Sequence, residues 1–474
     1  MKKILLVTFA AALLAAPAMA QVDFTRYVAL GDSLTAGIAS ASYMDYYQQR
    51  SYPQLLATQA GAGLLQGPFI APPGLQPILE LKSLSPLAIG PTDMPPPADP
   101  FEYFYNLILE APYQNLGLSG ADTNDLLTKT GNALNLAAGN LDNVVYDMTL
   151  RIPQVPDPNT GELIDFTAMV AAISQQPTFL TVWIGSNDVL GAVLAATPID
   201  GITMTPLDEF MTDYTTVIGG LATSLPNTDI VVLNIFGDAR WIPFSSTVPI
   251  SVDVPGVGTV PLMGQNGPLV SGDFLTLPAG GLLGQGMGLP IPGSPPLPEN
   301  LDPATGAPGV ILRAAEIDII NERLAAVNGI IAGVADLFPN VHLFDVNGLF
   351  ADIVNGDFRT FGGIELTNDF LVGGIFSYDG FHPQNIGQAV VAGALIEFIN
   401  DEFNADLPQL NMYNILNEGD WQSPSPFKCV SCDPKKAILT REGFLQLYEI
   451  FLPELAARWN QQRHQQLSHS SSVD

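Results

Sequence analysis

A repeated order of short apolar run, polar turn and helical pattern constrains the fold of this chain more than any other feature. The runs are rich in β-branched and other apolar residues, end near Gly, Asn or Asp, and are followed by segments with helical periodicity. Strands that alternate with helices in this way pair in parallel, because each helix carries the chain back to the start of the next strand. The sequence therefore predicts an α/β architecture around a parallel sheet.

The pattern predicts strands and longer helices in alternation. The strands are expected at residues 27–30, 113–116, 178–184, 230–235 and 341–344. The helices are expected at residues 122–134, 166–175, 207–225, 310–337 and 385–400. Together they form one large domain over residues 21–422.

Long insertions near residues 66–100, 241–308 and 348–376 interrupt this order. They are rich in Pro or Gly and poor in charge. A flexible linker would be polar, so we expect these segments to have structure of their own. Two interpretations stay open: they form walls or lids of an apolar cleft, or they are edge hairpins that add stability.

The first 20 residues have the pattern of a cleavable signal peptide. Two lysines precede an apolar stretch, and Ala18-Met19-Ala20 supplies the small residues for cleavage after Ala20. The apolar stretch is short for a helix that spans a bilayer. We therefore expect the mature protein to be secreted, periplasmic or on the cell surface.

Residues 423–474 differ in charge from the rest of the chain. From Lys428 onward there are six basic and five acidic residues, whereas the whole chain has a formal net charge of −30. We expect a C-terminal appendage with a helix near 442–459 and a disordered tail, which either docks on the acidic body or binds a partner. Cys429 and Cys432 are the two cysteines of the chain, so no disulfide framework holds the fold, and their redox state is left open.

The charge of the chain also limits its partners. It has 47 Asp and Glu against 17 Lys and Arg, which excludes nucleic acid as a partner. Anionic lipid headgroups and acidic polysaccharides would be repelled as well. No cluster of His, Asp and Cys has the spacing of metal ligands, so neither a metal nor a cofactor is expected.

A serine lies where the first expected strand turns into a helix. Gly31-Asp32-Ser33-Leu34 follows the strand, so Ser33 is placed at a helix N-terminus, where free N–H groups favour developing negative charge. An isolated serine there would be interpreted as a helix cap, and that is our interpretation of Asp32.

Two further motifs end strands and offer hydrogen-bond donors. Gly120 follows the second strand, and a glycine lets its backbone N–H approach an oxyanion closely. Asn187 follows the third strand and can donate from a side-chain amide that does not titrate. The adjacent Asp188 is expected to cap the following helix.

The fourth motif pairs a carboxylate with a histidine. Asp379 precedes His382 by three residues, so it can accept from Nδ1–H, fix the tautomer and support the imidazolium. Of the other three histidines, His342 lies in an expected strand, and His464 and His469 lie in the tail. His382 is therefore the candidate general base.

These motifs resemble the four sequence blocks of the SGNH hydrolase superfamily, also called GDSL lipases and esterases, in the same order. The resemblance implies that Ser33 is the nucleophile, His382 the general base and acid, and Asp379 the orienting acid. It further implies an oxyanion hole made by the N–H groups of Ser33 and Gly120 and the Asn187 side chain. The implied fold is a three-layer, flavodoxin-like α/β/α sandwich around a five-stranded parallel sheet in the order 2-1-3-4-5.

The resemblance predicts a secreted serine ester hydrolase of the carboxylesterase or lipase type that works through an acyl-enzyme. The weakly charged insertions suit an apolar acyl group, so small-molecule or lipid esters are the expected substrates, with transient contact at a lipid surface. One alternative is a carbohydrate O-deacetylase, with sugar platforms at Trp183, Trp241 or the cluster Tyr43, Tyr46 and Tyr47, although core packing explains these rings equally well. Another is a catalytically inactive secreted binding protein.

Overall fold

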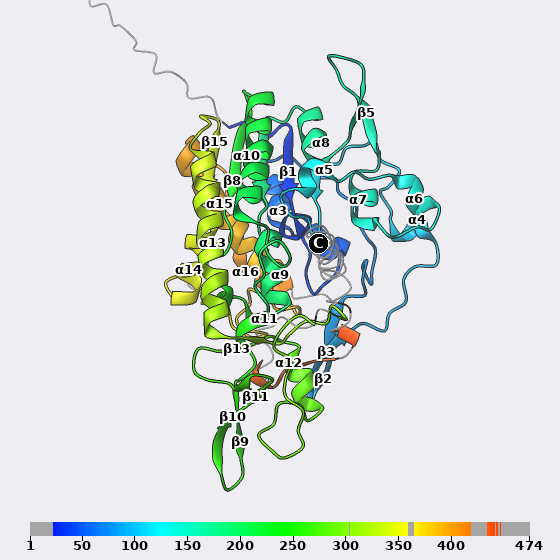
Figure 1. Ribbon diagram of the computed structural model, residues 1–474. Helices are drawn as coiled ribbons and strands as arrows, with labels where there is room; N and C mark the ends of the chain where they lie inside the picture. The colour runs from blue at the N-terminus through cyan, green and yellow to red at the C-terminus, as the bar shows by residue number, and fades with distance from the viewer. Residues whose placement is uncertain are drawn as a thin grey trace, which may run out of the picture.

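The computed structural model describes residues 22–302, 304–358, 365–418, 434–440, 442–443 and 446 (Figure 1). The expected signal peptide, both cysteines, the histidines of the tail and most of the expected C-terminal helix lie outside the described residues. No helix among the described residues is long and apolar enough to span a bilayer.

A five-stranded parallel sheet lies at the centre of the molecule. Its strands are β1 (Tyr27–Gly31), β4 (Asn115–Gly117), β7 (Phe179–Trp183), β8 (Asp229–Leu233) and β15 (Val341–Phe344). They are ordered β4-β1-β7-β8-β15, and every neighbouring pair is parallel. Taken along the chain this is the order 2-1-3-4-5, so the predicted fold class and strand order are confirmed.

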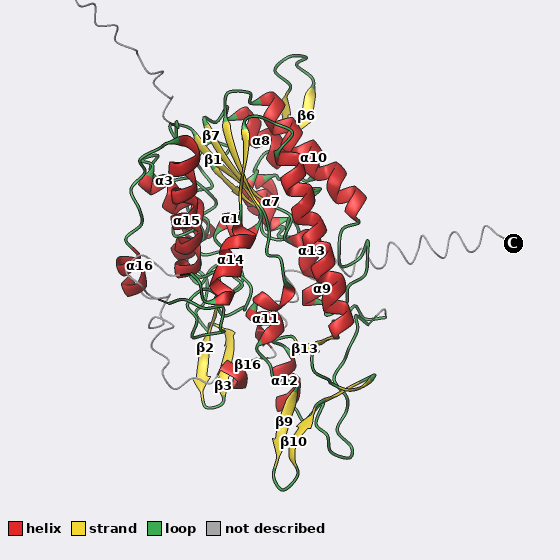
Figure 2. Cartoon of the chain, turned by 90° about the vertical axis from the view of Figure 1, so that its left-hand side faces the viewer, coloured by secondary structure: helices red, strands yellow, loops and turns green. Residues whose placement is uncertain are grey.

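Helices cover both faces of this sheet and complete the three layers (Figure 2). One layer holds α8 (Ala168–Ser174), α9 (Asn187–Leu194), α10 (Leu207–Ser224) and α13 (Ala314–Ala335), and the other holds α3 (Tyr52–Gln59) and α15 (Asn385–Phe403). All residues of β1 and β7 are buried, as expected for parallel strands covered on both sides. Further helices include α1 (Ser33–Ala36), α2 (Asp45–Gln48), α4 (Pro100–Tyr103), α7 (Val144–Thr149), α14 (Val346–Asn355) and α16 (Met412–Glu418).

The prediction of one continuous helix at residues 122–134 was wrong. The chain forms two short helices there, α5 (Asp125–Thr128) and α6 (Ala133–Ala137). Between them, Gly131 packs so closely on the backbone of Tyr146 that a Cβ would lie 1.9 Å from the Tyr146 carbonyl oxygen. The Asn132 side chain then accepts from Leu134 N and caps the second helix.

The start of the helix predicted at residues 310–337 also differs. The helix begins at Ala314, because Ile311 and Leu312 form strand β14 (Ile311–Leu312), which pairs with β13 (Phe274–Leu275). The helices predicted at 166–175, 207–225 and 385–400 correspond to α8, α10 and α15 within a few residues.

The first two insertions contain short hairpins that gather at one end of the molecule (Figure 1). Residues 66–100 include the hairpin of β2 (Leu79–Leu84) and β3 (Leu87–Pro91). Another hairpin, β5 (Gln154–Pro156) with β6 (Leu163–Asp165), lies outside the insertions. Residues 241–308 contain α11 (Pro243–Ser246), β9 (Ser251–Val254), β10 (Gly258–Pro261), β11 (Met263–Gly264), β12 (Gly267–Pro268) and α12 (Ala279–Gly284). A separate apolar cluster joins Leu262, Leu275 and Leu297 of this second insertion to Ile311 of β14.

The described part of the C-terminal appendage docks on the first insertion. Strand β16 (Ile438–Leu439) pairs in parallel with β3, and Thr440 N donates to Ile89 O at 2.7 Å. Ala437 and Leu439 are buried. Backbone pairing and apolar burial therefore hold this segment on the body.

Candidate active site

Ser33 is the first residue of α1 and is separated from strand β1 by Asp32 alone. Asp32 is the N-cap of this short helix, and its Oδ1 accepts from Leu34 N at 2.9 Å, which confirms the predicted cap. Its Oδ2 has no hydrogen-bond partner among the described residues. Burial raises the pKa of Asp32 to about 7, against the opposing effects of the Leu34 N–H and of His382.

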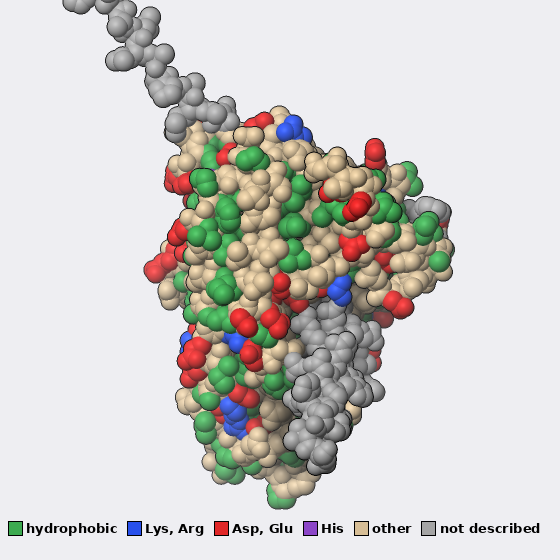
Figure 3. All heavy atoms as spheres, turned by 45° about the horizontal axis from the view of Figure 1, so that its top comes forward, with side chains coloured by type: hydrophobic (Ala, Val, Ile, Leu, Met, Phe, Trp, Pro, Cys, Tyr) green, Lys and Arg blue, Asp and Glu red, His purple; other side chains and the backbone are tan. Residues whose placement is uncertain are grey.

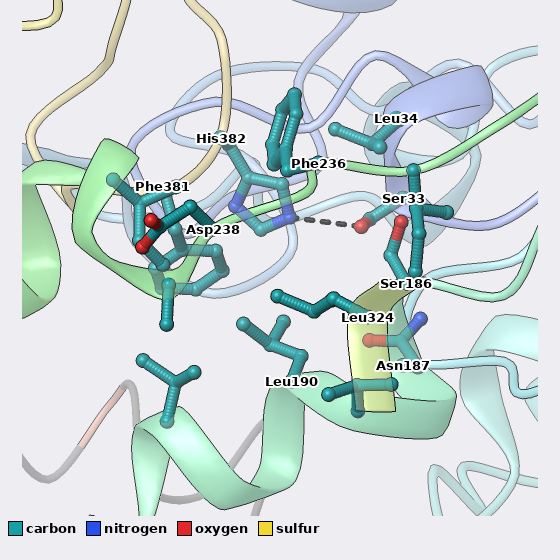
Figure 4. Close-up of a pocket in the computed structure, with 15 residues that line it drawn as sticks. Ser33, Leu34, Ser186, Asn187, Leu190, Phe236, Asp238, Leu324, Phe381 and His382 are labelled. Atoms are coloured by element: carbon teal, nitrogen blue, oxygen red, sulfur yellow. Dashed lines mark hydrogen bonds between the residues drawn. The ribbon is translucent and has the colours of Figure 1, made fainter. Parts of the chain in front are cut away.

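Ser33, His382 and Asp379 form a hydrogen-bonded row, and Figure 4 shows the link between His382 and Ser33. His382 Nε2 lies 2.9 Å from Ser33 Oγ, and His382 Nδ1 lies 2.9 Å from Asp379 Oδ2. All three side chains are buried. The loop after β15 and α14 thus reaches back over the carboxyl end of β1 and brings together groups that are 349 residues apart in the sequence.

Asp379 receives hydrogen bonds on both carboxylate oxygens. Oδ1 accepts from Phe381 N at 3.0 Å and from His382 N at 2.9 Å, and Oδ2 accepts from Ala41 N at 2.7 Å as well as contacting His382 Nδ1. Burial acts to raise the pKa of Asp379, but His382 and the backbone N–H groups together hold it below its ordinary value. Asp379 is therefore ionised at neutral pH.

Ala41 is a residue that sequence reasoning missed. It contributes a backbone N–H, and its side chain is a methyl group, so no residue-type signal marks it. Its nearness to Asp379 depends on contact between segments 338 residues apart.

The three candidate oxyanion donors, Ser33, Gly120 and Asn187, lie on the segments that follow β1, β4 and β7. Asn187 is the first residue of α9, and its Nδ2 donates to Ala121 O at 2.8 Å, which leaves one amide hydrogen for another acceptor. Gly120 follows β4 with a φ of 79°, and a Cβ built there would meet no atom within 4 Å, so it faces open space. Ser33 and Asn187 both line the pocket described below, whereas Gly120 is not among the described residues that line it.

The interpretation of Asp188 as a helix cap was wrong. Asp188 lies inside the first turn of α9, and its Oδ2 accepts from Thr123 N at 3.1 Å and from Thr123 Oγ1 at 2.8 Å. This pair ties α9 to the chain that follows Gly120. Burial, together with the nearby Asp122, raises the pKa of Asp188 to about 7.

An apolar pocket of about 590 Å³, partly open to solvent, lies beside Ser33 and His382 (Figure 4). Its apolar lining comes from α1, α9, the chain after β8, α13 and the loop of His382: Leu34, Val189, Leu190, Val193, Ile235, Phe236, Ala239, Ile242, Leu324 and Phe381. Among the described residues of the three insertions, Ile242 is the one that lines the pocket.

Four of the five aromatic residues considered as sugar platforms make contacts away from the pocket. Trp183 is fully buried and its Nε1 donates to Asn234 O at 3.1 Å, and Tyr43 and Tyr47 are also buried. Arg50 stacks on the Tyr46 ring at 4.0 Å. None of these rings lines the pocket among the described residues, and Trp183, Tyr43 and Tyr47 are core residues.

Several solved structures are similar to this chain at low sequence identity. They include a family 3 carbohydrate esterase from Clostridium thermocellum, with 14% identity over 80% of this chain and 96% of that one and a TM-score of 0.31. An acetylxylan esterase from Geobacillus stearothermophilus has 12% identity over 81% and 96%, with a TM-score of 0.34. A phospholipase A1 from Streptomyces albidoflavus has 15% identity over 78% and 98%, with a TM-score of 0.32.

No curated protein matches the chain. The model of the family described as GDSL-like Lipase/Acylhydrolase matches residues 27–395. The chain therefore belongs to the GDSL-like lipase/acylhydrolase family and is a serine ester hydrolase.

Proposed function

We propose that this enzyme hydrolyses carboxylic esters with an apolar acyl chain, using Ser33, His382 and Asp379. The observation that carries the proposal is the apolar pocket that opens directly beside the Ser33 hydroxyl. Acyl chains gain free energy from burial in such a pocket, at about 0.8 kcal/mol for each buried CH₂ group.

The proposed chemistry is acyl transfer through an acyl-enzyme. His382 Nε2 removes the Ser33 proton as Oγ attacks the ester carbonyl, and Asp379 stabilises the imidazolium. His382 then protonates the leaving alcohol as the bond between the carbonyl carbon and the alcohol oxygen breaks. Water attacks the acyl-enzyme with His382 again as base, and collapse of the second tetrahedral intermediate releases the acid and restores the Ser33 hydroxyl.

The proposed oxyanion hole consists of the Ser33 and Gly120 backbone N–H groups and the Asn187 amide. Such donors act where negative charge develops, and each one that is fixed in advance lowers the barrier without reorganisation. The link from Asn187 Nδ2 to Ala121 O supports this assignment, because it couples the Asn187 side chain to the turn that contains Gly120.

The first test is a Ser33→Ala variant assayed on p-nitrophenyl esters from acetate to dodecanoate. We expect the wild type to prefer the longer chains and Ser33→Ala to lose nearly all activity. Ser174→Ala is a matched control, because Ser174 Oγ bonds only within α8, to Ala171 O. Wild-type activity confined to acetate would instead support a carbohydrate deacetylase. If a fluorophosphonate fails to label Ser33 of the wild type, the protein would be an inactive binding protein.

The second test narrows the pocket. Leu190, on α9, lines it, and Leu190→Trp should reduce kcat/KM for dodecanoate at least about tenfold while that for acetate stays within about twofold. Leu190→Met conserves volume and serves as the control. An equal loss for both esters would contradict the proposal that acyl chains occupy this pocket.

We also propose that the enzyme acts outside the cytosol. The signal-peptide pattern of residues 1–20 supports this. N-terminal sequencing of the protein exported by an expressing bacterial host should begin at Gln21, and retention of Met1 in the soluble cytosolic fraction would contradict the proposal.

A further inference from the structure

A tight turn next to the site has an unfavourable backbone conformation. Residues Ala39 to Ser42 form the turn, which is closed by Ser42 N donating to Ala39 O at 3.1 Å. Its two central residues, Ser40 and Ala41, have φ values of 52° and 57°. Turns with two left-handed central residues favour Asn and Gly there, and other residues persist in this conformation only where their surroundings hold them.

The surroundings that hold this turn come from the loop that carries Asp379. Ser40 N donates to Ser377 Oγ at 2.8 Å, and Tyr378 N donates to Ser40 Oγ at 3.3 Å. These hydrogen bonds run in opposite directions between the same two segments, so they fix the turn in both position and orientation.

The turn so fixed presents one group to the site. Ala41 N donates at 2.7 Å to Asp379 Oδ2, the carboxylate oxygen that also contacts His382 Nδ1. All these groups are buried. The other two donors to Asp379, Phe381 N and His382 N, belong to its own loop and bond to Oδ1. Ala41 therefore supplies the donor to Oδ2 that comes from another segment.

We propose that the Ser40–Ala41 turn is a positioning element that holds Asp379 Oδ2 and sets how strongly this carboxylate supports the His382 imidazolium. Ser40, Ala41 and Ser377 act through Asp379 and are positioning residues. The inference rests on the proposed function of Asp379 and His382.

A residue of the C-terminal appendage supports the same turn from outside. Gln446 is 6% exposed, and its Nε2 donates to Pro77 O at 2.7 Å and to Ala41 O at 3.4 Å. Because Ala41 carries the N–H that binds Asp379, Gln446 connects the appendage to the site through a single residue.

The test removes the side-chain anchors of the turn and leaves the reacting groups in place. We expect Ser377→Ala to lower kcat about threefold and Ser40→Ala/Ser377→Ala about tenfold or more, with KM nearly unchanged. Asp379 and His382 share one loop, so their own contact persists. With a weaker Ala41 donor the carboxylate attracts the imidazolium more strongly, and the acidic limb of the kcat/KM profile should move to higher pH by about half a unit.

The pH readout has two other carboxylates to consider, and one of them, Asp238, lines the same pocket as His382 and pairs with Arg240. Asp32 faces His382 from the N-cap of α1, and the two groups influence each other electrostatically. None of the substitutions contacts Asp32, so its effect on the profile is common to all variants. A second readout, the downfield proton resonance of His382 Nδ1–H, should shift in the same variants without any substrate.

Gln446→Ala and Thr228→Ala complete the design. Gln446→Ala should shift the acidic limb of the kcat/KM profile and the His382 Nδ1–H resonance in the same direction as Ser377→Ala does, but by a smaller amount. Thr228 Oγ1 donates to Pro177 O at 2.6 Å at the start of β8, so Thr228→Ala removes a comparable buried hydrogen bond and should move neither readout.

The outcomes separate the two levels of the argument. In one outcome, His382→Ala and Asp379→Asn abolish hydrolysis, but the acidic limb of the kcat/KM profile and the His382 resonance do not shift in Ser40→Ala/Ser377→Ala. The inferred positioning role of the Ser40–Ala41 turn is then wrong, and the proposed function stands. A shift of the acidic limb of the kcat/KM profile to lower pH would also overturn the inference. If His382→Ala or Asp379→Asn keeps full activity, the proposed function itself fails.

Discussion

At the scale of single residues, Asn187 and Ser33 are expected to differ sharply in how much activity their removal costs. Loss of one oxyanion donor raises the barrier by about 2.7–4 kcal/mol, which is two to three decades in kcat. Loss of the nucleophile ends covalent catalysis. We therefore expect Asn187→Ala to keep measurable activity well above that of Ser33→Ala, with KM little changed, in steady-state assays on one ester.

Asn187 also bonds to Ala121 O, so its variant needs a structural control. The thermal midpoint and the fluorophosphonate labelling of Ser33 should both persist in Asn187→Ala. An Asn187→Ala enzyme as fast as the wild type would remove this residue from the oxyanion hole.

Asp188 is expected to make stability depend on pH. Burial and Asp122 raise its pKa from an ordinary 3.8 to about 7, so folding favours the protonated form. The stability from this group is fully present below about pH 4 and is lost as pH rises through about 7. Asp188→Asn keeps an acceptor for Thr123 and stays neutral, so at pH 8 its free energy of unfolding should be higher than that of the wild type.

Urea unfolding of both proteins at pH 5, 6, 7 and 8 measures this effect. The wild type should lose stability across the series, and the variant should lose less. Asp32, whose pKa is also raised to about 7, remains in both proteins, so the variant should retain part of the slope. Parallel curves would show that Asp188 does not titrate in this range.

The side chains that perform the proposed chemistry could be predicted from the sequence, whereas those that position them could not. Ser33 and Asn187 follow the strands β1 and β7, and Asp379 and His382 are spaced so that the carboxylate can contact the imidazole, so their joint order along the chain marked them. Ala41 acts through its backbone, which no residue type reveals. Asp188 fits the pattern of a helix cap, and its actual partner, Thr123, is set by contact between segments 65 residues apart.

At the scale of elements, β16 is expected to hold the C-terminal segment mainly through Leu439. This side chain is 2% exposed, and its backbone pairs with Ile89 of β3. Leu439→Ala removes buried apolar contacts worth about 2–5 kcal/mol, and β16 is short. We expect the segment to open locally, seen as loss of hydrogen-exchange protection at the Thr440 amide, while protection in β1 and β7 is kept.

Leu84→Ala is the matched control for this experiment. Leu84 lies in β2 of the same small sheet but is 61% exposed, so its truncation should leave the Thr440 amide protected. Loss of protection throughout β1 and β7 in Leu439→Ala would show that the segment unfolds only together with the central sheet.

The elements of the central sheet were predictable because burial on both faces leaves a continuous apolar run, as in β7. The hairpin of β9 and β10 has no such run, because its residues are exposed or only partly buried. The division between α5 and α6 depends on Gly131 packing against Tyr146, a tertiary contact that local periodicity does not contain.

At the scale of the whole molecule, acidic side chains outnumber basic ones over the visible surface (Figure 3). The chain carries 47 Asp and Glu against 17 Lys and Arg, so at neutral pH the folded state brings many like charges close together. The described ion pairs neutralise only a few of these acidic charges. The two ion pairs of Arg313, with Asp273 and with Glu299, are largely buried.

This imbalance predicts that moderate salt stabilises the fold. The Debye length falls from about 30 Å at 0.01 M to about 8 Å at 0.15 M, so added NaCl screens repulsion between surface carboxylates well before it weakens the buried pairs of Arg313. We expect the thermal midpoint at pH 7.5 to rise by several degrees between about 10 and 200 mM NaCl and to rise much less at pH 4.5, where many carboxylates are protonated. Sucrose at equal osmolality is the control for general solvent effects. A midpoint that falls with salt at pH 7.5 would mean that attractive ion pairs, and not the excess of like charge, dominate the electrostatics of this molecule.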